Sequence, residues 1–434
     1  MSYLPNIAFL LILSLSLGYF ISNIIKLKRN INLGVDLDID LSVNRKKRWA
    51  NMVKIAFGQS KMVRRPIVGA LHAIVYVGFI IINIELLEIV IDGLIGTHRV
   101  FSGMGVFYGF LIASFEILAV LVIFAVSVFW IRRNIIKVKR FFEDSMKGWP
   151  KLDADLILYF EIILMSLFLL MNATDVTFQN MNNGNIISGF IYPLFENYSA
   201  ESLHIMERVF WWMHIIGILL FLNYLYFSKH LHILLAFPNT FYASLDNKGK
   251  MNNLKSVTNE VNLMLNNNPA IEENFEENMN DIMKFGASDV SDLNWFQLLN
   301  AYSCTECGRC TDVCPANITG KKLSPRKIMM DTRDRLEEVS KNIDKNKGDF
   351  VDDGKKLIDD YISREELWAC TSCNACVEEC PISIDPLSII LDMRRYLVME
   401  EASAPAELNN MMSNIENNGA PWPYNQMDRL NWKD

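Results

Sequence analysis

Hydrophobic positions are concentrated in roughly the first 235 residues, and the rest of the chain is polar. The first part contains five apolar runs long enough to cross the ~30 Å hydrocarbon core of a bilayer as helices. They contain so few charges that buried helices of a soluble protein explain them poorly. The pattern therefore predicts a bundle of five transmembrane helices, at about residues 4–25, 66–91, 105–131, 154–174 and 206–235.

Lysine and arginine are distributed unevenly between these runs. Residues 26–65 hold eleven basic residues and 132–151 hold seven, whereas 92–104 hold one and 172–207 none. Because cytoplasmic loops are enriched in basic residues, all five helices can be oriented consistently, with the N-terminus outside. The first run has its basic residues after it, which is typical of a retained helix rather than of a cleaved signal peptide. The polar part is then expected in the cytoplasm.

All eight cysteines lie between Cys304 and Cys380, so they do not form the spread of positions that a disulfide framework needs. Thiols packed this closely indicate a reducing compartment and a bound metal. The net charge of −7 argues against nucleic acid as a partner, because such proteins carry a basic face.

The cysteines form two copies of one motif, C-x2-C-x2-C-x3-C-P. This is the pattern of two-cluster ferredoxins, in which the fourth cysteine of each run binds the other cluster. Zinc is the weaker alternative, because a zinc site takes four ligands in pairs. We expect one [4Fe–4S] cluster on Cys304, Cys307, Cys310 and Cys380, and a second on Cys370, Cys373, Cys376 and Cys314.

A repeat accompanies the motifs. Ser324–Pro325 and Asp385–Pro386 each predict the start of a helix after a motif, with the polar residue as N-cap. The sequence between the motifs is also helical in character, which favours an α-helical ferredoxin domain. The expected fold is all-α, and the expected division is 1–238 for the membrane bundle, 239–284 for a solvated linker, 285–400 for the cytoplasmic ferredoxin domain and 401–434 for a tail.

Four histidines lie in or beside the second and fifth runs. His72 and His232 are expected at one depth, near the cytoplasmic surface, and two imidazoles so placed on neighbouring helices suit bis-histidine ligation of haem. His214 lies 18 residues before His232, five turns on one predicted helix, and so on the same face. His230 is expected to point away and, with Lys229, to reach the membrane boundary. A lone histidine at a helix end is more often interfacial than a ligand.

His214 is the candidate ligand of an outer haem, and His98 in the outer loop is its candidate partner. Three carboxylates, Glu85, Glu88 and Glu116, fall within the second and third runs. Carboxylates at such depth tend to mark proton paths, so they are candidates for a quinone or proton relay. Hydrogen bonding between helices is the equally open alternative.

The cluster motifs, the preceding segment 293–304 and the histidine segment 212–232 resemble membrane Fe–S oxidoreductases related to heterodisulfide reductase. The membrane part is similar to the cytochrome b gamma subunit of respiratory nitrate reductase. The resemblance implies haem b between His72 and His232. It also matches His214 to a ligand of the outer haem, whose usual partner position is occupied here by Ile82.

The resemblance further implies electron transfer between a soluble partner and menaquinone or ubiquinone in a bacterial or archaeal inner membrane. The partner would be a CCG-type Fe–S protein, electron-transfer flavoprotein, or both. No cysteine follows Cys380, so we expect the CCG unit on a separate subunit, with the aromatic tail near Trp422 as a docking element. The alternatives are a haem-free membrane anchor with an Fe–S relay, a quinol-dependent reductase working in the opposite direction, and a redox sensor.

Overall fold

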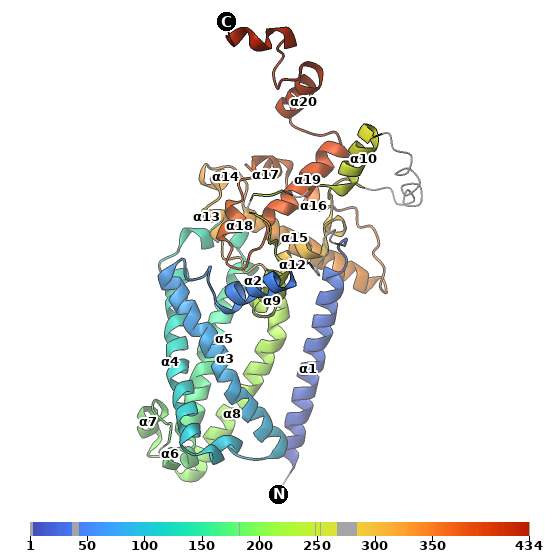
Figure 1. Ribbon diagram of the computed structural model, residues 1–434. Coiled ribbons are helices and arrows are strands. Elements are labelled where there is room, and N and C mark those ends of the chain that lie inside the picture. Colours follow the sequence, from blue (N-terminus) through green and yellow to red (C-terminus); the bar gives the residue numbers. More distant parts are fainter. Residues whose placement is uncertain are drawn as a thin grey trace.

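The computed structural model describes residues 3–36, 43–181, 183–247, 249–251, 253–266 and 284–433. In these residues the regular structure is helical, and strand-like pairing is limited to isolated bridges. Figure 1 shows a bundle of long helices beneath a domain of shorter ones. The prediction of an all-α protein in two parts is confirmed.

Among the described residues, five helices are long and apolar enough to cross a membrane, as predicted. Only 6% to 39% of each apolar stretch is fully buried, so most of these side chains keep some accessible surface. Exposed aromatic and aliphatic surface on this scale is what contact with lipid requires and what a soluble monomer avoids. The helices are α1 (Leu4–Ile31), α3 (Pro66–Ile95), α4 (Val106–Asn134), α5 (Trp149–Thr174) and α8 (Ala200–Tyr224).

The bundle is held together by close helix contacts. The helix α5 packs against α4 and α8, α3 packs against α4, and α1 lies against α3 and α8. Two glycines permit the approach, because a Cβ on Gly217 would lie 2.7 Å from Leu164 and one on Gly78 would lie 2.7 Å from Val122. Small residues at such positions let transmembrane helices approach closely and gain van der Waals contact.

The fifth apolar run is not one helix. After α8 come two 3-10 turns, η6 (Leu225–Phe227) and η7 (Lys229–Leu231), and then α9 (His232–Tyr242) begins. Ser228 has extended backbone between the turns, and its hydroxyl accepts a hydrogen bond from the backbone N–H of His230. The prediction of a continuous helix over 206–235 is therefore wrong, because a serine that bonds to nearby backbone starts a new turn.

Residues 285–400, here called the cysteine domain, form a helical core that also includes Leu27, Leu231 and Leu235 from the bundle. Leu298, Ile328, Leu336 and Met393 are fully buried in it. Its helices are α12 (Trp295–Ser303), α13 (Arg309–Asp312), α14 (Pro315–Ile318), α15 (Pro325–Lys345), α16 (Leu357–Asp360), α17 (Arg364–Ala369), α18 (Ala375–Glu379) and α19 (Pro386–Met399), with the 3-10 turn η8 (Val290–Asp292) before them.

Shorter elements complete the described chain. The expected linker contains the helix α10 (Lys255–Asn266), in which Val257, Val261 and Leu265 recur every four residues. Residues 267–283 of that linker lie outside the described residues. The remaining elements are α2 (Arg45–Met52), the π-helical turn η1 (Val53–Phe57), η2 (Val100–Met104), η3 (Lys139–Phe141), η4 (Asp144–Met146), α6 (Val176–Met181), α7 (Ser188–Ile191), η5 (Tyr192–Phe195), α10 (Lys255–Asn266), α20 (Ala406–Asn418) and η9 (Gln426–Lys433).

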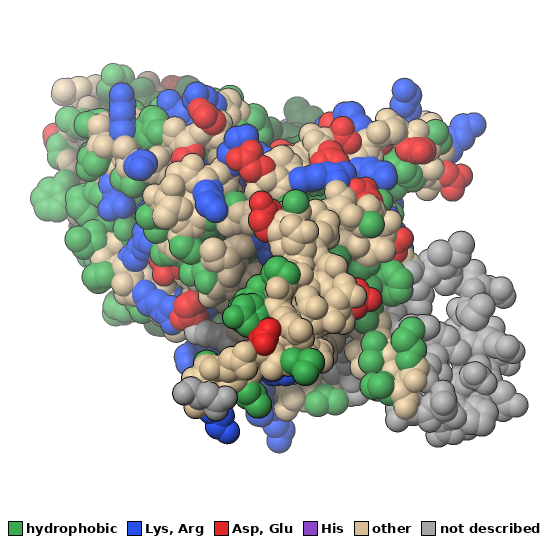
Figure 2. Space-filling view, turned by 90° about the horizontal axis from the view of Figure 1, so that it is seen from above, with side chains coloured by type: hydrophobic (Ala, Val, Ile, Leu, Met, Phe, Trp, Pro, Cys, Tyr) green, Lys and Arg blue, Asp and Glu red, His purple; other side chains and the backbone are tan. Residues whose placement is uncertain are grey.

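The cysteine domain is attached to one end of the bundle by ion pairs. Arg65, at the start of α3, bonds Glu379 at 2.9 Å, and Arg140, in η3, bonds Asp312 at 2.9 Å. The fully buried Arg326 donates to the backbone carbonyl of Arg140 at 2.6 Å. Viewed from above, the face of this domain carries interspersed Lys, Arg, Asp and Glu side chains (Figure 2). We call the opposite end of the bundle the distal end.

Candidate metal centres

The two cysteine loops have the same backbone. Glu306 and Gly308 in the first loop have φ of +54° and +71°, and Ser372 and Asn374 at the equivalent positions of the second have +56° and +62°. At Gly308 a Cβ would lie 2.7 Å from the guanidinium of Arg326, so glycine is needed there for space as well as for φ. The repeat seen in the sequence is thus a repeat of the loop conformation.

The helices that follow the loops begin as predicted. The hydroxyl of Ser324 accepts from the N–H of Lys327 at the start of α15, and the carboxylate of Asp385 accepts from the N–H of Ser388 at the start of α19. Backbone N–H groups also point at sulfur, from Ile384 to Cys380 at 3.3 Å. Such bonds to ligand atoms orient them toward a metal.

The cysteines gather into two groups that cross between the motifs. Cys380 lines the same cavity as Cys304, Cys307 and Cys310, and its thiol interacts electrostatically with that of Cys307. The other group is Cys314, Cys370, Cys373 and Cys376, in which Cys314 interacts with Cys370 and Cys376. Cys376 also borders the first cavity.

The chemistry of these sulfurs suits an iron cluster. All eight are free thiols. Burial raises the pKa of Cys304 to about 12 and that of Cys380 to about 11. A buried thiolate is stable only beside positive charge, and iron ions supply it directly. The residues present therefore fit two [4Fe–4S] clusters.

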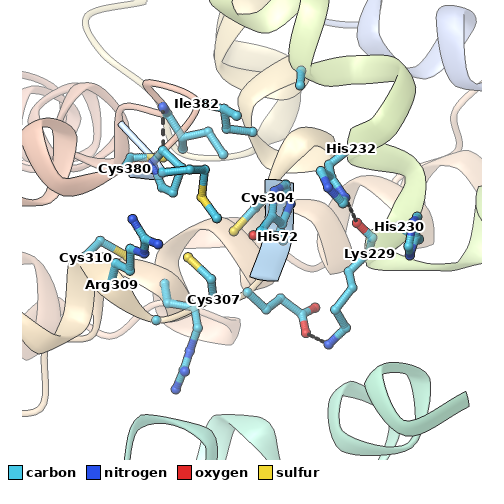
Figure 3. A pocket seen from close by; sticks show the side chains of 18 of the residues that line it. His72, Lys229, His230, His232, Cys304, Cys307, Arg309, Cys310, Cys380 and Ile382 are labelled. Carbon is cyan, nitrogen blue, oxygen red and sulfur yellow. Dashed lines mark hydrogen bonds and ion pairs between the residues drawn. The ribbon is translucent and has the colours of Figure 1, made fainter. Parts of the chain in front are cut away.

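Three histidines line the cavity of the first cysteine group, and His72 lies beside Cys304 in Figure 3. His72 from α3, His230 from η7 and His232 from α9 line the same cavity of about 360 Å³ as the cysteines. Its volume lies within the range of small-molecule and cofactor sites. The structure therefore brings together the two predicted haem ligands, although the helix that was expected to carry His232 is broken.

His232 is oriented by the backbone. Its Nδ1 lies 3.1 Å from the carbonyl oxygen of Lys229. A carbonyl can only accept, so Nδ1 carries the proton and Nε2 keeps the lone pair that a metal needs. His72 has a buried Nδ1 without a hydrogen-bond partner among the described residues. The pair therefore fits haem ligation, with two nitrogens not otherwise bonded.

Reasoning from the sequence missed the role of the turn between these histidines. His230 does not point away from the site, because the ring centroids of His230 and His232 lie 5.4 Å apart and both line the cavity. Lys229 is not a boundary charge either, since its ammonium group bonds Glu306 Oε2 at 2.5 Å. The side chain of Glu306 is 3% exposed and also bonds Arg333 at 2.8 Å. These two cations hold its pKa below the ordinary value despite burial. A serine before a charged turn is the signal that could have revealed the break.

The other predicted site residues lie toward the distal end. His214 is buried against Phe168, with ring centroids 6.1 Å apart. His98 lies 3.2 Å from Asp175 (Nε2 to Oδ2) and lines a small pocket that does not include His214. The structure thus does not bring His98 and His214 to a common pocket among the described residues.

The three predicted carboxylates differ in their contacts. Glu116 accepts from the backbone N–H groups of Ile187 and Ser188, at 2.7 and 3.0 Å, and so holds α7 in place. Glu88 accepts from the N–H of Phe101 at 2.8 Å. Glu85 has one buried oxygen without a hydrogen-bond partner among the described residues. Their use as a proton relay stays a prediction.

The helical bundle and the paired cysteine loops define a membrane-type iron–sulfur protein. Residues 303–384 match a family model described as a 4Fe-4S dicluster domain. No solved structure matches the chain.

Relatives are found among iron–sulfur oxidoreductases. The probable iron-sulfur-binding oxidoreductase FadF of Bacillus subtilis is 28% identical over 417 residues, covering 89% of this chain and 54% of the relative. EtfAB:quinone oxidoreductase of Syntrophomonas wolfei is 27% identical over the same length and with the same coverage. A probable membrane-anchored ferredoxin of Chromohalobacter salexigens is 34% identical over 163 residues, 34% of this chain and 24% of the relative.

These relatives are named as iron–sulfur oxidoreductases, a quinone oxidoreductase and a ferredoxin, which is the class that the sequence resemblance suggested. The chain is similar to iron–sulfur oxidoreductases and to oxidoreductase subunits, and it contains a 4Fe-4S dicluster domain. It spans about half the length of these two curated relatives, FadF and EtfAB:quinone oxidoreductase.

Proposed function

We propose that the chain is a membrane electron-transfer subunit. It passes electrons between a cytoplasmic redox partner and the quinone pool by way of two [4Fe–4S] clusters and one haem b. Bound to this chain, the clusters and the haem supply one-electron carriers. The residues hold these groups close together and away from water.

One observation carries the proposal: the first cysteine group and the two histidines line a single cavity. Cys304, Cys307 and Cys380 come from the cysteine domain, whereas His72 belongs to a membrane helix. Cofactors held from both sides would therefore lie next to each other at the junction of the two parts. Short separation is the main structural requirement for fast electron transfer. The ion pairs of Arg65 and Arg140 keep the two parts in contact.

We assign the first cluster to Cys304, Cys307, Cys310 and Cys380, and the second to Cys314, Cys370, Cys373 and Cys376. The crossing of Cys380 and Cys314 between motifs supports this assignment. We assign the haem to His72 and His232. We propose one haem rather than two, because His98 is engaged with Asp175.

The donor and the acceptor are inferred from the relatives. The name of one relative joins electron-transfer flavoprotein to quinone, and others are heterodisulfide reductase subunits. We propose that electron-transfer flavoprotein or a CCG-type Fe–S protein meets the cysteine domain on its cytoplasmic face. The mixed charges of that face would let complementary pairs fix the orientation of the partner (Figure 2).

Pyridine haemochrome spectroscopy of the purified chain tests the proposal. The wild type should contain one haem b per chain, and His72→Ala and His232→Ala should each lose it. His204→Ala is the matched control, because His204 is exposed at the distal end and should keep the haem. Iron and sulfide content should stay the same in all three variants, since the cluster cysteines are untouched.

The same experiment separates the main alternative, a haem-free anchor with an Fe–S relay. A wild type with both clusters and no haem would establish that alternative and exclude the route drawn here. Reduction of a soluble menaquinone analogue by the dithionite-reduced protein then tests the quinone step. Reaction in the wild type and its loss in His72→Ala would support the conduit, and a haem-loaded protein inert to the analogue would contradict it.

A further inference from the structure

A second group of metal-ligand side chains lies at the distal end, far from the cysteines. His98, Asp175 and Glu207 each offer one ligand atom, and these atoms lie within 4.8 Å of one another. They come from three separate segments: the turn after α3, the end of α5 and the helix α8. The small cavity that they border, with Glu85 and Arg208 among the other lining residues, is here called the distal pocket.

The distal pocket has an excess of negative charge. Five carboxylates line it and only two guanidinium groups, those of Arg99 and Arg208, so three negative charges are uncompensated when all groups are ionised. Uncompensated charge is costly away from water, and it must be neutralised by protons or by a cation. The five carboxylates are Glu85, Glu88, Asp92, Asp175 and Glu207.

One of these carboxylates points to a missing partner. Glu85 is 2% exposed, it lines the distal pocket, and its Oε2 has no hydrogen-bond partner among the described residues. Its neighbours are satisfied: Glu88 accepts from Phe101 and from the hydroxyl of Tyr108 at 3.1 Å. A cation in the pocket would place positive charge near this buried carboxylate, whose oxygen has no partner of its own.

The two arginines leave room for an ion. Arg99 is held in place, because it bonds Asp175 Oδ2 at 2.7 Å and Asn172 at 2.8 Å. Its guanidinium group also lies over the ring of Phe178. Arg208 pairs with Glu207, but its side chain is 38% exposed. A bound cation would replace Arg208, which contacts both oxygens of Glu207 and lies over the ring of Trp211, as the partner of that carboxylate. Arg99 would keep its bond to Asp175.

The volume of the distal pocket and its possible ligand atoms indicate which ion it could bind. Its volume is about 20 Å³, room for one ion or water and too small for an organic ligand. One imidazole with two carboxylates is a donor set suited to Mn²⁺, Fe²⁺ or Zn²⁺ rather than to a soft metal.

We propose that the distal pocket binds one divalent first-row transition cation through His98, Asp175 and Glu207. The cation joins the turn after α3 to α5 and α8, and it neutralises the excess negative charge. His98, whose side chain is 40% exposed, gives the ion a path from solvent. The site is independent of the haem, the clusters and the quinone.

Manganese binding to the full chain tests the site. The protein, with its clusters reconstituted so that the cysteines are occupied, is placed in lipid nanodiscs, treated with EDTA and titrated with Mn²⁺. The free ion is followed by its electron paramagnetic resonance signal. We expect one bound Mn²⁺ per chain, with affinity lowered at least about tenfold in His98→Ala and in Glu207→Gln.

Glu201→Gln is the matched control, because Glu201 is an exposed carboxylate on the same helix. This variant should bind Mn²⁺ as the wild type does. Manganese should raise the melting temperature of the wild type and the control but not of the two site variants. Cluster absorbance reports folding in every variant. A wild type that binds no Mn²⁺ up to millimolar concentration, or site variants that bind it like the wild type, would overturn the proposal.

Discussion

Lys229, in the turn η7, bonds Glu306 of the first cysteine loop, so replacing it tests how the bundle and the cysteine domain are joined. Its ammonium group bonds Glu306 at 2.5 Å and the carbonyl of Pro150 at 2.6 Å, and it lies 3.7 Å from Asp153. The Lys229 and Glu306 side chains are 10% and 3% exposed, so solvent screens the pair little. Lys229→Met keeps most of the stem and removes the charge.

The expected loss of stability depends on the bonds that Glu306 and Asp153 keep after the substitution. Removing one partner of a buried ion pair costs about 3–5 kcal/mol. Glu306 keeps Arg333 at 2.8 Å, and Asp153 keeps the hydroxyl of Tyr224 at 2.5 Å. The loss should therefore lie at the lower end, about 3 kcal/mol. At about 2–4 °C per kcal/mol, the melting temperature falls by about 6–12 °C.

The assay is the temperature at which half of the cluster absorbance is lost on heating in nanodiscs. Haem content should stay at one per chain, because His232 is held by the backbone carbonyl of residue 229 and not by its side chain. Glu306→Gln and the double variant complete a double-mutant cycle. Lys229→Met should cost less stability in the Glu306→Gln background than in the wild type, since the charged partner of Lys229 is already missing there.

Lys147→Met is the control, because Lys147 forms a fully exposed pair with Asp144 and should leave the melting temperature unchanged. Two results would refute the reasoning. One is a Lys229→Met protein that loses its clusters at the same temperature as the wild type. The other is additive effects of Lys229→Met and Glu306→Gln, within about 0.5 kcal/mol, because additivity means that the two side chains act independently.

Three further predictions concern the cysteine domain. Cys380→Ser should abolish the same cluster signal in electron paramagnetic resonance as Cys304→Ser, and Cys314→Ser should abolish the same signal as Cys370→Ser. The crossing would be refuted if Cys380→Ser instead removed the signal that Cys370→Ser removes. Gly308→Ala should destabilise the domain by about 1–3 kcal/mol in thermal unfolding, because its φ is +71° and the added Cβ would clash with Arg326. Gly320→Ala is the control and should cost less, because its Cβ would meet open space. Burial raises the pKa of Asp331 to about 6, although Asp331 forms an ion pair with Lys327. Lys327 also forms an ion pair with Glu366. A raised carboxyl pKa means that stability falls as pH rises from about 4 through 6, so Asp331→Asn should gain stability over the wild type across that range; a constant difference in melting temperature would contradict this.

Much of the fold could be predicted because it follows from local patterns. Apolar runs of sufficient length specify the five long helices, and Ser324 and Asp385 specify the starts of α15 and α19. The cysteine spacing specified the dicluster domain, which the family model confirms. Each of these signals lies within one continuous stretch of sequence.

The rest depended on contacts between distant residues. The break at Ser228 interrupts a run that is apolar on both sides, so hydropathy alone continued the helix through it. The carboxylate of Glu306 lies one residue before Cys307 in the sequence, but its partner Lys229 is 77 positions away. Nothing local could indicate that pair. For the same reason the distal pocket, assembled from three segments, was not foreseen as a unit.

The basic residues at the end of the bundle next to the cysteine domain have a consequence for assembly. Arg65 and Arg140 lie in the two basic segments whose charge would hold those segments on the cytoplasmic side during insertion, and both bond acidic residues of the cysteine domain. The same two side chains would therefore help to orient the helices in the bilayer and hold the cysteine domain against the bundle. If the proposed orientation holds, a helix pair inserted upside down would lack these contacts, so we expect the cysteine domain to dock only on a correctly inserted bundle.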